Sequence, residues 1–269
     1  MPATDPRVEF YPLRARLLTV ASAGYLTPRM IRITLTGDDL DGFRTDNYAD
    51  HVKLFFPDEE TGRHALPEVG ADGRWNMRDP GLLYRDYTVR RHDPDAAELT
   101  IDFVAHDHGP AGRWARAARP GDRLGVLGPR GTHHLPDVDY VLMGADETAL
   151  PAAARWLEEL PRDARAYAFL EVADPGEEQH IDAPDNAVVT WLHRDTDPSG
   201  GANLLERAIR GFTPPVGTGF AWCAGEATAL KPIRRHLRDS GFERGRTLDV
   251  DGYWRRGTVN LDHHAADDD

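Results

Sequence analysis

The sequence predicts two domains of different fold class: an antiparallel β-barrel over residues 1–135, followed by an α/β domain with a parallel sheet over residues 136–269. The length of 269 residues suits two domains of ordinary size better than one. The first half reads as one strand after another with hardly any helix, which is typical of a barrel. In the second half, short apolar strands alternate with helical segments, and this alternation favours a parallel sheet.

The elements of the first half are mostly strands separated by turn residues. Residues 30–36 alternate apolar with polar side chains, so this strand has one buried face and one wet face. Residues 23–28, which include Gly24 and Pro28, read as the turn before it. Further strands are predicted over residues 13–22, 51–56, 84–91, 98–105 and 123–127, and long loops over residues 37–50 and 57–81.

The elements of the second half alternate between strand and helix, and Pro136 marks the change. Pro151 falls in the first turn of the first helix, where proline is tolerated. Strands are predicted over residues 140–143, 166–172, 187–192 and 219–223, and helices over residues 149–160, 202–210 and 226–240.

Composition and charge exclude several classes of protein. The net charge of −13 argues against a nucleic-acid partner, because little in this chain could neutralise a phosphate backbone. The single cysteine, Cys223, excludes an intrachain disulfide and an iron–sulfur cluster held by four cysteines of this chain. The first residues lack the pattern of a signal peptide and no long apolar run follows, so we expect a cytoplasmic protein. The acidic residues 267–269 are expected to be disordered.

Residues 84–91, Tyr-Arg-Asp-Tyr-Thr-Val-Arg-Arg, gather three arginines, two tyrosines and a threonine on one predicted strand. Arginine binds a diphosphate bidentately, tyrosine packs on a flat ring, and a threonine hydroxyl can hydrogen-bond the ring edge. The combination therefore suits a flavin nucleotide. A basic outer strand of a barrel is the alternative interpretation.

The next strand and the segment after it extend this candidate site. Period-two alternation places Asp102, Val104 and His106 on the face opposite a continuous apolar face, where a ligand could reach them. Residues 109–115, Gly-Pro-Ala-Gly-Arg-Trp-Ala, then open a short helix. Exposed N–H groups at a helix start bind anions, so this start could hold a diphosphate.

Two strand ends in the second half carry similar residues: Gly-Ala-Asp-Glu-Thr at 144–148 and Cys-Ala-Gly-Glu-Ala-Thr at 223–228. Ligands of open α/β sheets bind outside the carboxyl ends of the strands, so these segments are candidates for a nucleotide site. Ordinary turn chemistry is the alternative. The sequence has no GxGxxG fingerprint and no P-loop, which argues against a Rossmann-type dinucleotide fold and against an NTPase.

Taken in order, these motifs resemble the siderophore-interacting proteins, flavin-dependent ferric-siderophore reductases related to the ferredoxin–NADP reductase superfamily. The resemblance covers nearly the whole chain, and the ordered set of motifs, together with the late Tyr-Trp-Arg at 253–255, is specific to this family. The motifs that carry it are Arg-Asp-Tyr-Thr-Val-Arg at 85–90, Asp-Phe-Val at 102–104 with His106, Gly-Pro-Ala at 109–111 with Trp-Ala at 114–115, Ala-Asp-Glu-Thr-Ala-Leu-Pro-Ala at 145–152, Ala-Gly-Glu at 224–226 and Gly-Tyr-Trp-Arg-Arg-Gly at 252–257.

The resemblance implies an FAD-binding barrel, with Arg85 at the diphosphate and Thr88 near the flavin ring, and an NAD(P)H-binding second domain. Asp107 stands where the family commonly has glycine, and a carboxylate beside a diphosphate is repulsive unless it points away. The predicted FAD contacts are Arg85, Tyr87, Thr88, Asp102, Val104, His106, Gly109, Pro110, Ala111, Gly112 and Trp114. The predicted NAD(P)H contacts are Asp146, Glu147, Thr148, Ala224, Gly225 and Glu226.

The implied reaction is reduction of a siderophore's Fe(III) to Fe(II), with electrons from NADPH or NADH passing through FAD. Lys53, Arg130 and Arg255 are candidates for binding an anionic ferric siderophore, although each could be an ordinary surface charge. The chain needs no iron ligands of its own, because the siderophore already fills the coordination sphere. We also expect no catalytic acid or nucleophile.

Several alternatives remain open at this point. Ferredoxin could replace NAD(P)H, another acceptor could replace the siderophore, or the protein could carry siderophores without reducing them. The sequence does not separate NADH from NADPH, although Arg155, Arg194 and Lys231 could meet a 2′-phosphate. We expect a monomer.

Overall fold

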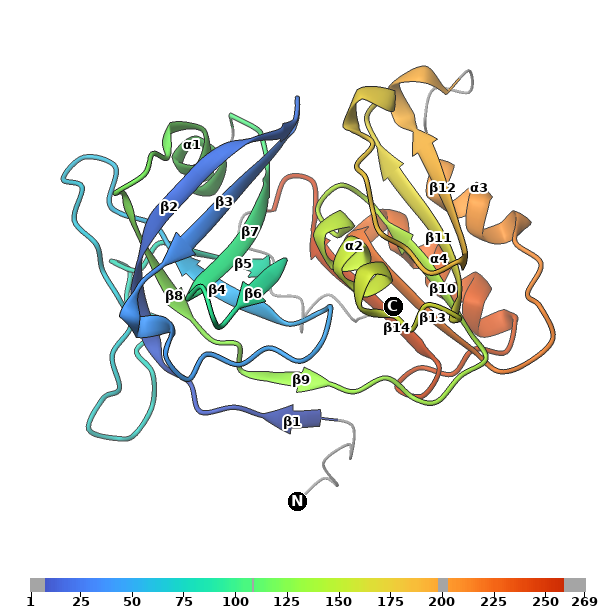
Figure 1. The fold of residues 1–269 in the computed structure, drawn as a ribbon, viewed down its shortest axis with the longest axis horizontal. Coiled ribbons are helices and arrows are strands. Elements are labelled where there is room, and N and C mark those ends of the chain that lie inside the picture. Colours follow the sequence, from blue (N-terminus) through green and yellow to red (C-terminus); the bar gives the residue numbers. More distant parts are fainter. Residues whose placement is uncertain (1–7, 108, 198–202, 259–269) are drawn as a thin grey trace. The chain divides into compact units, whose positions relative to one another are not determined.

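A computed structural model describes residues 8–107, 109–197 and 203–258 of the chain. The chain divides into two compact units, Met1–His134 and Leu135–Asp269 (Figure 1). The chain start and the acidic residues 267–269 considered above lie outside the described residues. Within the described ranges, no helix combines the length and the apolar character needed to cross a membrane.

The first unit is built on a seven-stranded sheet in which every neighbouring pair of strands is antiparallel. In spatial order the strands are β5 (Tyr84–Thr88), β4 (His51–Phe55), β8 (Arg123–Leu127), β2 (Ala15–Thr27), β3 (Met30–Thr36), β7 (Glu98–Val104) and β6 (Arg91–Asp93). Only Val89 and Arg90 join the two edge strands, β5 and β6, so the sheet must curl until its edges meet. Arg90 N donates to Thr100 O of β7 over 3.0 Å at this join. The predicted antiparallel barrel is confirmed.

The core of the barrel follows the predicted alternation. Ile31, Ile33 and Leu35 of β3 are at most 2% exposed, whereas Arg32 between them is half-buried. Burying each such aliphatic side chain stabilises the fold by about 1.5–3 kcal/mol. On the neighbouring strand β7 the apolar face is equally buried, with no exposure of Leu99, Ile101 or Phe103.

Strand β2 is longer than the sequence indicated. It continues to Thr27, so the turn predicted over residues 23–28 shrinks to Pro28 and Arg29. Its pairing with β3 shifts register at two places, as β-bulges do, and most of its last seven side chains are exposed. A bulged strand without a buried face lacks the alternation that identifies strands in a sequence.

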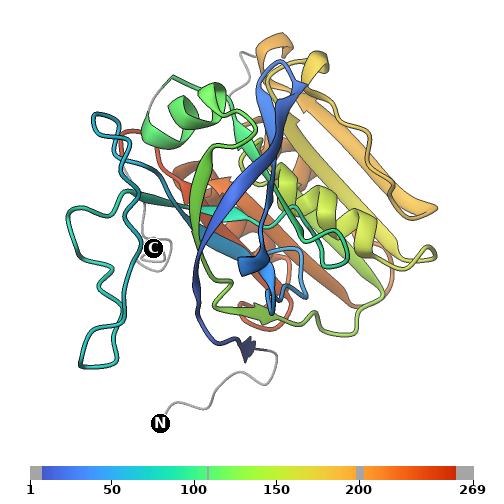
Figure 2. The ribbon, with the colours of Figure 1, turned by 60° about the vertical axis from the view of Figure 1, so that its left-hand side comes forward.

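The loops of the first unit carry little regular structure. A single 3₁₀ turn, η1 (Asp38–Leu40), interrupts the acidic loop, and the excursion over residues 57–81 runs outside the sheet (Figure 2). The short helix α1 (Gly109–Ala117) lies where it was predicted. Two strands that the sequence did not reveal, β1 (Val8–Phe10) and β9 (Gly131–His133), pair with each other.

The second unit contains a five-stranded sheet in which all strands are parallel, as predicted. In spatial order the strands are β12 (Asn186–His193), β11 (Arg165–Val172), β10 (Tyr140–Ala145), β13 (Gly219–Glu226) and β14 (Leu248–Trp254). In chain order this is 3-2-1-4-5, the order of doubly wound dinucleotide-binding sheets. The argument from the missing glycine fingerprint against a Rossmann-type arrangement was therefore wrong about the strand order.

Helices cover both faces of this sheet (Figures 1 and 2). Helices α3 (Leu204–Gly211) and α4 (Ala227–Asp239) share one apolar cluster with one face of the sheet. Helix α2 (Leu150–Glu159) covers the opposite face, where Trp156 lies edge-on against Phe220 and Trp222 at ring-centre distances of 6.0 and 5.9 Å. Two 3₁₀ turns, η2 (Pro175–Glu177) and η3 (Arg194–Thr196), follow β11 and β12.

Cys223 lies in β13 with no exposed surface. Burial raises the pKa of its thiol to about 12, so the nucleophilic thiolate is scarce at neutral pH. Cys223 is therefore a buried residue of the apolar core rather than a reactive thiol.

We therefore expect Cys223 to resist a thiol reagent such as Ellman's reagent in the native protein, because both its burial and its raised pKa oppose attack. The same sample in concentrated guanidinium chloride should release one equivalent of the chromophore per chain, since the chain has one cysteine. Fast reaction of the native protein would contradict the buried placement.

Candidate functional site

Strand β5 presents the arginine and tyrosine of the sequence motif on one face. Arg85 and Tyr87 are half-buried, and Thr88 at the end of the strand is 7% exposed. Because side chains alternate along a strand, Arg85 and Tyr87 share a face while Thr88 faces the other way. The structure thus groups the first two residues and separates the third from them.

Arg85 differs from its cationic neighbours in lacking a carboxylate partner. Its Nη1 donates to the Tyr84 carbonyl oxygen over 2.6 Å, and within the described residues it forms no ion pair. Desolvation lowers the pKa of its guanidinium from the usual value. By contrast, Lys53 Nζ binds Asp86 Oδ1 at 2.6 Å. A half-buried cation of this kind fits an anionic group such as the diphosphate of FAD.

Aromatic rings join β5 to β7 and to helix α1. The Tyr87 ring lies 4.4 Å from that of Phe103, and the Phe103 ring lies 6.0 Å from that of Trp114. Trp114 also meets Phe56 edge-on at 5.7 Å. Burial raises the pKa of the Tyr87 phenol, so it stays neutral at ordinary pH. Through these contacts two of the predicted FAD residues, Tyr87 and Trp114, belong to one continuous aromatic cluster.

Asp102 was predicted to lie on a face that a ligand could reach, but in the structure arginine side chains enclose it. Its side chain is 1% exposed, and it binds Arg32 through two hydrogen bonds of 2.7 Å. Arg90 Nε lies 3.7 Å from the same carboxylate. A buried carboxylate between two arginines orients them, so any contribution of Asp102 to a ligand site passes through Arg32 and Arg90. Val104, at the end of the same strand, is half-buried.

The start of helix α1 is packed closely against the residues before it. A side chain at Gly112 would overlap the His106 carbonyl oxygen and come within 2.8 Å of the His106 ring, so only glycine fits there. Gly109 has a φ of +75°, which also favours glycine. Pro110 is half-buried and Ala111 is 4% exposed. The predicted diphosphate segment therefore follows a tightly constrained backbone path.

Asp107, the departure from the family pattern, forms an ion pair with Arg116 in the last turn of α1. Its carboxylate is 80% exposed. The charge that would repel a diphosphate is therefore compensated within the same segment.

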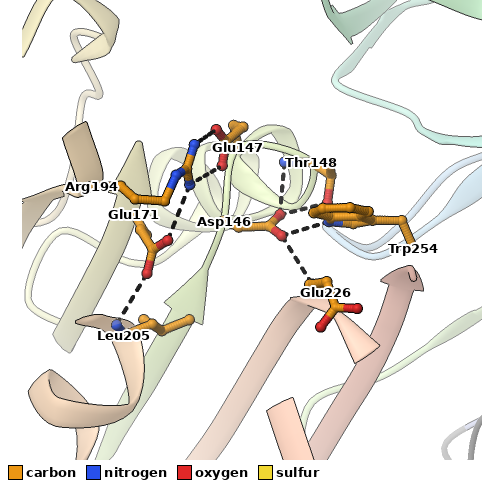
Figure 3. A network of polar contacts seen from close by, with 8 residues as sticks. All are labelled: Asp146, Glu147, Thr148, Glu171, Arg194, Leu205, Glu226 and Trp254. Carbon is orange, nitrogen blue, oxygen red and sulfur yellow. Dashed lines mark hydrogen bonds and ion pairs between the residues drawn. The ribbon is translucent and has the colours of Figure 1, made fainter. Parts of the chain in front are cut away.

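In the second unit, the buried carboxylate of Asp146 joins the carboxyl ends of three strands (Figure 3). Oδ1 accepts bonds from Thr148 N (2.8 Å) and Thr148 Oγ1 (2.5 Å), and Oδ2 accepts bonds from Glu226 N (2.9 Å) and Trp254 Nε1 (2.8 Å). Desolvation, followed by the charge of Glu147, raises the pKa of Asp146 to about 6. At neutral pH the group is therefore ionised and can accept all four bonds.

The end of β13 packs directly against this carboxylate. Gly225 has a φ of +150°, and a side chain there would come within 2.6 Å of Asp146. Ala224 is fully buried. The Glu226 carboxylate caps helix α4 by accepting from Ala229 N over 2.7 Å. Asp146, Thr148 and Glu226 thus hold the strand ends together, and their predicted contact with NAD(P)H stays a prediction.

Glu147 is bound to Arg194, which follows β12, and Arg194 also contacts Glu171 near the end of β11 (Figure 3). Glu171 Oε2 in turn accepts from Leu205 N, in the first turn of α3, over 3.1 Å. Two residues of this group were missed as site residues in the sequence, Glu171 and Leu205. The position of Glu171 in the sequence could have indicated it, because it stands at the carboxyl end of a predicted parallel strand, and open α/β sheets bind ligands outside that edge.

The three candidates for siderophore binding are distributed over both units. Lys53 lies in β4, paired with Asp86 and 5.2 Å from the centre of the Tyr84 ring. Arg130 follows β8 and lies 5.8 Å from the Phe10 ring centre. Arg255 follows β14 in the second unit.

Comparison with known proteins assigns a family to both halves of the chain. The profile of the siderophore-interacting FAD-binding domain matches residues 19–133, and that of the siderophore-interacting protein family matches residues 138–257. A solved structure, a siderophore utilization protein from T. fusca, is 60% identical with a TM-score of 0.91, covering 96% of this chain and 98% of its own.

Two curated relatives bear names that state an activity. The ferric vibriobactin reductase ViuB of Vibrio cholerae is 36% identical over 254 residues, which are 93% of this chain and 92% of ViuB. The NADPH-dependent ferric-chelate reductase of Escherichia coli is 34% identical over 246 residues, covering 90% of this chain and 93% of the relative. The chain therefore belongs to the siderophore-interacting protein family.

Proposed function

We propose that this protein reduces the Fe(III) of a ferric siderophore to Fe(II), with electrons that pass from NAD(P)H through bound FAD. The observation that carries the proposal is the full-length likeness to two proteins named as ferric reductases, each covered over at least 92% of its length. The match of the first unit to an FAD-binding domain supports the cofactor.

The residues present in the first unit fit FAD. Arg85 would bind the diphosphate, because it is a half-buried cation with no ion pair among the described residues. The backbone at the start of α1, from Gly109 to Gly112, would donate N–H groups to the same diphosphate. Tyr87 and Trp114 would pack on the ring system, whereas the predicted contact of Thr88 is not supported, because Thr88 faces the other side of β5 and is 7% exposed. When bound, FAD accepts two electrons as hydride and releases them singly, which is what Fe(III) requires.

The carboxyl edge of β10 and β13 would bind NAD(P)H. The chain reverses its direction of strand addition between these two strands, and open α/β sheets bind ligands over that point. The bonds of Asp146 to Thr148 and Glu226 keep this edge in one conformation.

Lys53, Arg130 and Arg255 would attract an anionic ferric siderophore against the strong negative charge of the whole chain. The chelator's oxygen donors hold Fe(II) less well than the harder Fe(III), so reduction releases the metal without a protein ligand. No catalytic acid or nucleophile takes part. We place the reaction in the cytoplasm and expect a monomer, and ferredoxin remains the alternative donor.

The proposed reaction is tested by mixing the FAD-loaded protein anaerobically with NAD(P)H, a ferric siderophore and ferrozine, which colours on binding Fe(II). We expect Fe(II) to form only when the protein, FAD and NAD(P)H are all present. Replacing Arg130 or Arg255 with alanine should raise KM for an anionic chelate by up to about tenfold, the effect of one lost charge contact. Absence of Fe(II) with NAD(P)H but formation with reduced ferredoxin would move the donor assignment to ferredoxin, and absence with both would overturn the reductase assignment.

The FAD assignment predicts that Arg85→Ala weakens FAD binding by about 10- to 100-fold, the effect of removing a charged hydrogen-bond donor. The matched control is Arg91→Ala, which alters an arginine of the same motif that is 71% exposed and paired with Asp93. Quenching of flavin fluorescence on titration with apoprotein measures both affinities. Equal affinity of the Arg85→Ala variant and the wild type would show that the diphosphate lies elsewhere.

A further inference from the structure

A cluster of three charged residues lies at the carboxyl ends of β10, β12 and β11: Glu147, Arg194 and Glu171 (Figure 3). Arg194 Nη1 donates to Glu147 Oε2 over 3.0 Å and to Glu171 Oε1 over 3.1 Å, while Nη2 donates to the other oxygen of Glu147. The hydrogen bonds to Glu147 are the largest cause that holds the pKa of Arg194 above its usual value. Two carboxylates and one guanidinium give the cluster a formal net charge of about −1.

The topology of the sheet places this cluster within reach of a dinucleotide that lies over β10 and β13. From β10 and β13, the bound dinucleotide would extend across the sheet either toward β14 or toward β11 and β12. On the β14 side, the Trp254 indole is bound to Asp146. On the other side lies Glu171, at the end of the strand beside β10. In sheets of this strand order, an acid near that position binds the 2′-hydroxyl of the adenosine ribose, or an arginine nearby binds a 2′-phosphate.

The arginine of this cluster is already engaged by carboxylates. A 2′-phosphate carries about −1.5 to −2 charges at neutral pH, so it would meet a cluster that is itself negative. A 2′-hydroxyl, by contrast, can donate a hydrogen bond to a carboxylate oxygen. The other two cations that the sequence offered give no alternative at this place: Arg155 is 4% exposed and paired with Glu159, and Lys231 lies in helix α4.

We propose that the Glu147–Arg194–Glu171 cluster determines the choice of donor and selects NADH over NADPH. The selection presupposes the NAD(P)H-dependent reaction proposed above. Glu147 and Glu171 hold the guanidinium in place and accept the ribose 2′-hydroxyl, and their charge repels a 2′-phosphate. In this respect the protein differs from its Escherichia coli relative, which is named as NADPH-dependent.

The test is a calorimetric titration of the FAD-loaded protein with NAD⁺ and with NADP⁺, which bind without reducing the flavin. We expect the wild type to bind NAD⁺ at least about tenfold more tightly, and kcat/KM for NADH and NADPH to show the same preference. Glu147→Gln and Glu171→Gln each remove one negative charge and loosen the hold on Arg194. Each should therefore strengthen NADP⁺ binding and lower the preference for NAD⁺ by about tenfold.

The matched control is Glu206→Gln, which removes the same charge from an ion pair with Arg210 in helix α3 and should leave the preference unchanged. Tighter binding of NADP⁺ than of NAD⁺ by the wild type overturns the proposed selection, as does an unchanged preference in both cluster variants. Binding of neither nucleotide, with no reduction of the flavin by NADH or NADPH, overturns the donor assignment and the selection together.

Discussion

The buried carboxylate of Asp146 is the interaction on which the carboxyl edge of the parallel sheet depends. It accepts four hydrogen bonds from Thr148, Glu226 and Trp254, which lie at or just after the ends of three neighbouring parallel strands. Helices that follow such strands begin with N–H groups that have no partner within the helix, and one ionised carboxylate can accept from several donors there. Leaving such a buried donor unpaired costs about 1–3 kcal/mol, so the geometry of the whole edge rests on this residue.

The same constraint explains the glycine beside it. Gly225 is required because Asp146 occupies the space of any side chain at that position. The motif Ala-Gly-Glu at 224–226 thus makes room for the carboxylate and caps helix α4 through Glu226. The cluster around Arg194 extends this polar edge over β11 and β12.

Charge pairing distinguishes the arginines of the first unit from one another. Arg32 and Arg90 surround Asp102, so these two cations are compensated by the fold. Arg85 sits half-buried with only a carbonyl oxygen as its bonded partner among the described residues. In a chain with a net charge of −13, a half-buried cation of this kind suits an anionic ligand, which is why we propose Arg85 as the diphosphate contact.

Much of the fold follows from local patterns in the sequence. Alternation identified β3 and β7, and apolar runs beside helical segments identified the parallel sheet. Strand β14 was not predicted, because the alternation of Leu248 and Val250 with Asp249 and Asp251 is short and is followed directly by Gly252. The end of β2 carried no alternation at all, since bulges and exposure remove it.

The candidate sites were harder to predict than the elements, because partners distant in sequence decide the role of a polar residue. Asp102 was expected to face a ligand, yet Arg32, 70 positions away, encloses it. Asp146 and Trp254 are 108 positions apart, and only the sheet brings them together. Asp107 looked unfavourable for a diphosphate until Arg116 was seen to pair with it.

The protein turns the two electrons of a nicotinamide donor into two single-electron reductions of chelated iron. The anaerobic ratio of Fe(II) formed to NADH or NADPH consumed, followed by absorbance in one cuvette, tests this stoichiometry. We expect about two Fe(II) per nucleotide, because a hydride carries two electrons and Fe(III) accepts one. Consumption of the nucleotide without Fe(II), or Fe(II) without its consumption, would contradict it.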